Sequence, residues 1–227
     1  RYLLISSSRQ GSLPANLQGA WNQYEFAPWS GGYWHNVNIQ MNYWPAFNTN
    51  LAELFIPYMN YNETFRKAAV NKAVNYITQN NPEALNSIAE ENGWTIGTGA
   101  TAFGIEGPGG HSGPGTGGFT TKLFWDYYDF TRNKQLLKDH VYPALMGMAK
   151  FLSKTLKPQS DGTLLADPSF SPEQVHQQKY YRSKGCIFDQ SMILETYHDL
   201  LNAAKILNDK DPFLKTVKEQ MGKLDAI

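Results

Sequence analysis

Runs of apolar residues at helical spacing alternate with long irregular stretches rich in glycine, proline, asparagine and tryptophan. Apolar side chains recur near every third or fourth position and predict helices over residues 63–79, 120–131, 134–156, 189–207 and from 212 onward. We also expect a helix over residues 38–54, ended or kinked at Pro45, and the last turns of another over residues 2–5. No strand pattern competes with these runs. The sequence therefore predicts an all-α protein, as a helical toroid with its site at one rim or as a plain bundle.

Three stretches between the expected helices are irregular. Residues 97–118 are too rich in glycine and proline for any regular element and fit a linker, a mobile lid or a substrate loop. Residues 11–36 form a second long loop, and residues 157–186 a third, which contains Asp167 and Glu173. Asn62 is a candidate N-cap for the helix that follows it.

Charge and composition restrict the kind of ligand. The 20 Lys and Arg residues balance the 20 Asp and Glu residues, so neither nucleic acid nor an anionic membrane surface is an expected partner. Aromatic residues make up 14% of the 227 residues, and many lie in the irregular stretches. Such rings stack on sugars or fill a core, and composition alone supports both. Cys186 is the single cysteine, and His111 has no partners at metal-ligand spacing, so we expect no disulfide, metal or cofactor.

The densest polar cluster is residues 36–45, which read NVNIQMNYWP. Asn36 and Asn38 alternate, so an extended backbone directs both to one cavity, and Asn38 and Asn42 share a face of the helix that follows. The alternative is that these amides cap the helix, which the spacing alone favours.

Glu173 is the best candidate for an acid, because it lies in an irregular stretch with Asp167 nearby. Here too the spacing offers an alternative. Ser171 as an N-cap, Pro172 at the first helical position and an acid in the first turn describe the start of a helix, and the spacing alone favours this alternative. Asp189 precedes a helical run and is most simply an N-cap.

Three motifs in this order resemble the glycoside hydrolases of family 95, the α-L-fucosidase and α-L-galactosidase-like enzymes. They are YLLISSSR with GSLPANLQGAWN at residues 2–9 and 11–22, NVNIQMNYWP at residues 36–45, and SFSPE at residues 169–173. The resemblance implies an (α/α)₆ toroid of the six-hairpin type, incomplete here. Residues 1–227 are then the N-terminal and middle part of one catalytic domain, with the glycine-rich loop at 97–118 and truncation at both ends.

The resemblance also implies an inverting exo-hydrolase for terminal α-L-fucosyl or related residues, without a cofactor. Glu173 matches the family's general acid, and Asn38 matches the residue that holds the attacking water. Asn36 matches a second residue, beside Asn38, that takes part in binding and positioning. The aspartate that assists Asn38 lies in a C-terminal motif outside this chain, so the segment alone is expected to be inactive. Trp34, His35, Asn42 and Trp44 are the expected substrate-binding residues. The family also implies a secreted, periplasmic or cell-surface protein.

Two departures from the family pattern concern the sugar. Trp34 stands where family fucosidases commonly have a histidine, with His35 displaced by one position, and residues 93–99 read GWTIGTG in place of a His-His-Asn stretch. We therefore expect either a relative of α-L-fucose, such as α-L-galactose, as the preferred glycosyl group, or a differently decorated fucoside as the substrate. Two alternatives remain, namely a non-catalytic carbohydrate-binding protein on the same scaffold and a structural domain whose Asn and Trp residues are caps and core.

Overall fold

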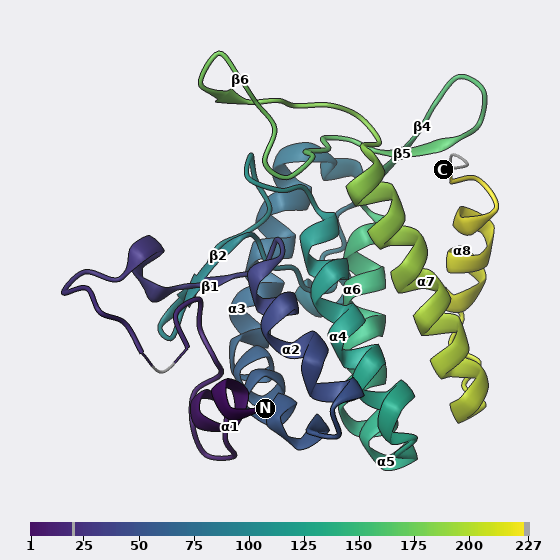
Figure 1. Ribbon diagram of the computed structural model, residues 1–227. Coiled ribbons are helices and arrows are strands. Elements are labelled where there is room, and N and C mark those ends of the chain that lie inside the picture. The colour runs from purple at the N-terminus through teal and green to yellow at the C-terminus, as the bar shows by residue number, and fades with distance from the viewer. Residues whose placement is uncertain (20, 225–227) are drawn as a thin grey trace.

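A computed structural model describes residues 1–19 and 21–224 of the chain. The fold is all-α, with short helical turns η1 to η5 between the main helices (Figure 1). The helices are α1 (Tyr2–Ser7), α2 (Asn38–Asn48), α3 (Ile56–Asn80), α4 (Gly115–Thr131), α5 (Lys134–Leu136), α6 (Tyr142–Ser153), α7 (Ile187–Leu207) and α8 (Phe213–Met221). The turns are η1 (Pro28–Gly31), η2 (Ala52–Phe55), η3 (Pro82–Ala84), η4 (Ala89–Asn92) and the π-helical η5 (Leu137–Val141).

The helices form hairpins arranged in two rows. Figure 1 shows α2, α4 and α7 running in one direction in the nearer row, while α3 and α6 return behind them and α8 returns beside α7. α4 packs against α2, α6 and α7, and α7 also packs against α6 and α8. The first turns of α2, α4 and α7 therefore lie at the same end of the molecule.

Aromatic side chains fill the core between the two rows. Tyr43, Phe55, Tyr58 and Phe124 are fully buried, and their ring centroids lie 5.4 to 5.6 Å from one another along a continuous chain of contacts. Edge-on and tilted geometries prevail, as the ring quadrupoles favour. Much of the aromatic content is therefore core. Other rings, such as Trp29 (70% exposed) and Phe26 (85% exposed), lie outside it.

Short strands occur where the sequence predicted none. They are β1 (Tyr33–Trp34), β2 (Gly99–Thr101), β3 (Gly104–Ile105), β4 (Leu156–Pro158), β5 (Leu164–Ala166), β6 (Val175–His176) and β7 (Lys179–Tyr180). β1, β2 and β3 form an antiparallel sheet in which Trp34 is opposite Gly99, and β4–β5 and β6–β7 are hairpins. Strands of two or three residues are too short to produce an alternating pattern, and the expectation that residues 97–118 hold no regular element was wrong on their account.

Several helix boundaries also differ from the prediction. α2 continues past Pro45 to Asn48, because the buried Phe47 keeps the last turn packed although the proline lacks a donor. α3 begins at Ile56, with Pro57 in its first turn, so Asn62 is not an N-cap. Instead, Asn62 is buried inside α3 and accepts a hydrogen bond from Arg66 Nη2 at 2.9 Å.

The expected helix over residues 134–156 is divided into α5, the π-helical η5 and α6. Pro143 lies in the first turn of α6. A proline lacks a donor and its ring crowds the carbonyl four residues earlier, which a wider π turn relieves. α7 and α8 lie close to their predicted positions.

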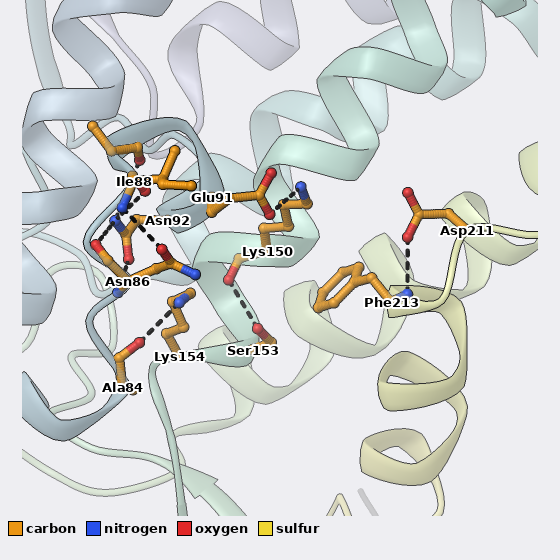
Figure 2. Close-up of polar contacts among 11 residues, drawn as sticks. Ala84, Asn86, Ile88, Glu91, Asn92, Lys150, Ser153, Lys154, Asp211 and Phe213 are labelled. Atoms are coloured by element: carbon orange, nitrogen blue, oxygen red, sulfur yellow. Dashed lines mark hydrogen bonds and ion pairs between the residues drawn. The ribbon is translucent and has the colours of Figure 1, made fainter.

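Polar contacts join the segment between α3 and β2 to α6 (Figure 2). Lys154 Nζ donates to the Ala84 carbonyl at 2.8 Å, and Lys150 Nζ pairs with Glu91 at 2.7 Å. Gly93 follows η4 with φ of 70° and lies directly against the Gly147 backbone, so a side chain has no space there. None of the residues in these contacts lines the pocket described next.

Candidate functional site

A pocket of about 420 Å³ lies at the end where α2 begins. Its walls come from the loop before η1, from η1, from the segment that joins β1 to α2, from the glycine-rich segment and from the loop after β5. The lining residues are Leu17, Gln18, Trp29, Trp34, Asn36, Val37, Asn38, His111 and Glu173. Indole rings, carboxamides, an imidazole and a carboxyl group therefore meet in one cavity, which suits a neutral polyhydroxylated ligand.

Asn36 and Glu173 are in direct contact although 137 residues separate them. Asn36 Nδ2 lies 2.6 Å from Glu173 Oε1. Asn36 is 9% exposed, whereas Glu173 is an exposed residue at the pocket. Because a carboxamide carries both a donor and an acceptor, Asn36 can pair with Glu173 in either protonation state of the acid.

Helix capping does not explain these two residues. The N-cap position of α2 is Val37, without a side-chain capping bond, so Asn36 precedes the helix and Asn38 is its first residue. Residues 171–174 form a turn, and the β6–β7 hairpin follows. The interpretation of Ser171 as the N-cap of a helix is therefore wrong, and Glu173 reaches the pocket from a loop.

Four of the predicted site residues line the same pocket, namely Asn36, Asn38, Glu173 and Trp34. Trp34 Nε1 donates to the Trp29 carbonyl at 3.3 Å, which orients its ring. The backbone of β1 explains the direction of the indole, since Tyr33 on the opposite face of the strand is buried.

The other predicted substrate-binding residues, His35, Asn42 and Trp44, do not line this pocket. His35 is fully buried beside Tyr58, with 5.9 Å between ring centroids, and burial lowers the pKa of its imidazole to about 4. Asn42 Nδ2 donates to the Asn16 carbonyl at 3.0 Å. Trp44 packs against Phe119 on α4. These three side chains contact the scaffold around the pocket, and their role in substrate binding stays a prediction.

Several residues of the pocket wall were not predicted from the sequence. Leu17 and Gln18 belong to the first motif and Trp29 to a helical turn. His111 was set aside because the glycines around it gave no metal-ligand spacing. Its ring lies 6.4 Å from Trp34 and 4.5 Å from Tyr180, whose hydroxyl is 2.6 Å from His111 Nε2. The available signal was an imidazole side chain within the glycine-rich run of residues 107–115.

Asp189 is not the N-cap of α7. That position belongs to Cys186, and Asp189 lies in the first turn, where it is fully buried. Burial raises the pKa of Asp189 to about 6, although hydrogen bonds from Ser169, Gly115 and Phe170 favour its ionised form.

Within residues 1–19 and 21–224, no group of three or more His, Cys, Asp or Glu side chains is placed to hold a metal ion. None of the helices in this part of the chain is long and apolar enough to cross a membrane.

The all-α fold and a pocket lined by indole rings, carboxamides and a carboxyl group define the class of this protein, an all-helical domain with a polar, aromatic-lined pocket at one end. The model of the glycosyl hydrolase family 95 catalytic domain matches residues 1–227, and the chain belongs to this family. A probable alpha-fucosidase A of Aspergillus niger is 33% identical over 232 residues, which cover 95% of this chain and 27% of the relative. Alpha-L-fucosidase 2 of Arabidopsis thaliana is 32% identical over 220 residues, which cover 91% of this chain and 24% of the relative. The chain thus spans about a quarter of the length of these relatives.

Proposed function

We propose that this chain forms part of an inverting exo-glycoside hydrolase that removes terminal α-L-fucosyl or related α-L-galactosyl residues from glycans. The observation that carries the proposal is the 2.6 Å contact between Asn36 and Glu173 in a pocket that Asn38 and Trp34 also line. Residues from two distant motifs thereby supply an acid and two carboxamides to a cavity of sugar size. The expected binding partner is a fucosylated or related glycan.

In the proposed reaction, protonated Glu173 donates its proton to the glycosidic oxygen as the bond from that oxygen to the anomeric carbon breaks. Asn38 holds a water whose oxygen attacks the anomeric carbon from the opposite face, and the water's proton passes to a base. Asn36 contacts the acid and keeps its carboxyl group directed into the pocket. The indole of Trp34 offers an apolar surface for one face of the sugar ring.

The base is assigned to a part of the whole protein outside residues 1–227. The two named relatives are about four times as long as the stretch they share with this chain. We propose that residues 1–227 are the N-terminal and middle part of one (α/α)₆ barrel, and that an aspartate from the rest of the barrel activates the water on Asn38. Residues 1–227 expressed alone are then inactive.

Two differences from the family pattern, Trp34 and residues 93–99, favour α-L-galactosides or decorated fucosides as substrates. The relatives are named as fucosidases. Here Trp34 is opposite Gly99 in the sheet, and a side chain at Gly97 or Gly99 has no space beside Gly107 or Glu106. Of these departures only Trp34 lines the pocket, and residues 99–100 adjoin it through the pairing of β2 with β1.

The test is turnover of phenyl α-L-fucoside and phenyl α-L-galactoside by the whole protein and by its Glu173→Gln variant. An enzyme of this mechanism loses about 10²- to 10⁴-fold in kcat on losing its acid, because glutamine fills the space without a transferable proton. The ratio of kcat/KM for the two glycosides identifies the glycosyl group. A wild-type protein that binds the sugar without turnover, and with unchanged affinity in Glu173→Gln, is the carbohydrate-binding protein of the alternative hypothesis.

A further inference from the structure

One buried carboxylate connects the segments that form two walls of the pocket. Asp189 Oδ1 accepts a hydrogen bond from the Gly115 backbone at 2.7 Å, at the start of α4. Its other oxygen, Oδ2, accepts from Ser169 Oγ at 2.5 Å and from the Phe170 backbone at 3.1 Å, with Cys186 Sγ at 3.4 Å. Asp189 thereby binds α4, the loop after β5 and the start of its own helix.

The glycine-rich segment is shaped around this carboxylate. Gly113 and Gly115 approach it so closely that a side chain at either position would overlap the Asp189 carboxyl group. The Gly113 backbone also donates to the Phe170 carbonyl at 3.1 Å. A buried carboxylate requires donors on both oxygens, and a loop that lacks side chains can bring its backbone donors that close.

Both loops that Asp189 holds lead directly into the pocket. His111 precedes Gly113 by two residues, and Glu173 follows Phe170 by three. α7 is a 21-residue helix packed against α4 and α6, so the carboxylate has a rigid base. Hydrogen bonds to Asp189 therefore lie within three residues of Glu173 on one loop and within four residues of His111 on the other.

We propose that Asp189 is a positioning residue for the acid of the reaction, holding the loop of residues 169–173 so that Glu173 meets the glycosidic oxygen. The inference rests on the proposed function. Asp189 does not itself act on substrate, because it is fully buried and both oxygens accept hydrogen bonds from the protein.

Displacement of the general acid slows hydrolysis more for a basic leaving group than for a weakly basic one. A phenoxide leaves with a proton from Glu173 as the carbon–oxygen bond breaks, whereas fluoride leaves as a weakly basic anion and needs little proton donation. In both cases the oxygen of the attacking water forms the new bond to the anomeric carbon. Misplacement of the acid by about 1 Å costs on the order of 10²-fold in rate, and only on the substrate that needs the proton.

The experiment compares the phenyl α-L-glycoside with the α-L-glycosyl fluoride in the whole protein, using the glycosyl group that the wild type hydrolyses faster. Asp189→Asn is expected to lower kcat on the phenyl glycoside by about 10²-fold and to leave the fluoride within a few-fold of wild type. Asp199→Asn is the matched control, because Asp199 is also buried on α7 but hydrogen-bonds to neither loop. This variant is expected to keep the wild-type rates on both the phenyl glycoside and the fluoride. Equal losses on both substrates in Asp189→Asn, or no loss, overturn the inference.

Two further variants separate the possible failures. Glu173→Gln must itself lose the phenyl glycoside and retain the fluoride; if it does not, the proposed function fails, whatever Asp189→Asn does. If Asp189→Asn does not fold, as judged by its thermal melt, Ser169→Ala removes a single donor to the same carboxylate. It is expected to show the same selective loss at smaller size, and an unselective loss in Ser169→Ala counts against the inference.

Discussion

Asp199 and Asp189 are both buried on α7, but their surroundings differ. Asp189 accepts hydrogen bonds on both oxygens, whereas Asp199 Oδ2 has no hydrogen-bond partner in the described part of the chain and lies 4.0 Å from Lys122 Nζ. Burial, together with the neighbouring carboxylates such as Glu195, raises the pKa of Asp199 to about 8. These effects outweigh the positive charge of Lys122, which lowers the pKa. The native state therefore binds a proton at Asp199 more tightly than the unfolded chain does.

This difference predicts a pH dependence of stability. Between about pH 4, where an aspartate in the unfolded chain titrates, and pH 8, where Asp199 titrates in the fold, the native state holds the extra proton. The contribution of Asp199 to the free energy of unfolding is thus fully present below that window and declines as the pH rises through it. Asp199→Asn removes the titration, so we expect the wild type to lose melting temperature relative to the variant between pH 5 and pH 8. A constant difference between the two melting curves across this range would contradict the assignment.

The sequence does not show which asparagines line the pocket and which hold the scaffold. Asn36 and Asn38 line the pocket, whereas Asn42, in the same motif, holds the Asn16 backbone. His35 was placed at the sugar but is fully buried. Spacing describes a residue's neighbours along one element, and the partners that decide these roles come from segments up to 137 residues away. Family resemblance selected Asn36, Asn38 and Glu173, which spacing alone assigned to caps.

The boundary between α4 and α5 depends on two adjacent residues. Arg132 ends α4 in the left-handed region with φ of 53°, and Asn133 begins α5 as its N-cap. Asn133 Oδ1 accepts hydrogen bonds from the backbone of Gln135 at 3.0 Å and of Leu136 at 3.1 Å. These are donors that the first turn of a helix otherwise leaves unpaired.

Removal of this cap should weaken the α4–α5 corner without affecting the site. We expect Asn133→Ala to lower the free energy of unfolding by about 1 kcal/mol, since alanine offers no acceptor to the first turn. Chemical denaturation at pH 7 measures the change, with Asn133→Asp as the control that keeps an acceptor oxygen. A loss of the same size in both variants would show that the cap is not the cause.

Elements differed in how well the sequence predicted them. α7 and α8 were predicted nearly as the structure has them, because the periodicity reflects the side each presents to the core. α4 begins at Gly115 and not at residue 120, and the expected helix over residues 134–156 is divided. The start of α3 was missed by several residues, since its first turns bury tyrosines and Pro57, which resemble loop residues. β1, β2 and β3 were not predicted. Their pairing joins residues 33–34 to residues 99–105, and short strands of this kind depend on contacts distant in sequence.

At the scale of the whole molecule, the site is explained by the common direction of α2, α4 and α7. Their first turns lie at one end of the fold (Figure 1), and Asn38, Gly115 and Asp189 all lie in those turns. Segments far apart in sequence therefore meet at one rim. The sequence predicted a helical toroid with its site at a rim only as one of two arrangements, because periodicity gives the helices but not the order in which they pack.

The row formed by α2, α4 and α7 carries an apolar surface. Phe119 on α4 contacts Trp44 on α2 and Phe188 on α7, with ring centroids 6.0 and 5.9 Å apart. Met41 at 57% and Ile187 at 71% exposure extend this surface. Contiguous apolar surface of this kind is normally covered by further protein.

Residues 1–227 expressed alone are therefore expected to self-associate through this row. Sedimentation should show species heavier than the 25.6 kDa monomer, and the double substitution Met41→Lys with Ile187→Lys should return the chain to the monomer, because buried lysines in an apolar contact are strongly disfavoured. Phe103→Lys is the matched control, since Phe103 is 95% exposed on the β2–β3 turn, away from the row. If the wild-type segment sediments as a monomer, or if Phe103→Lys disperses it equally well, the surface on α2, α4 and α7 is not the site of association.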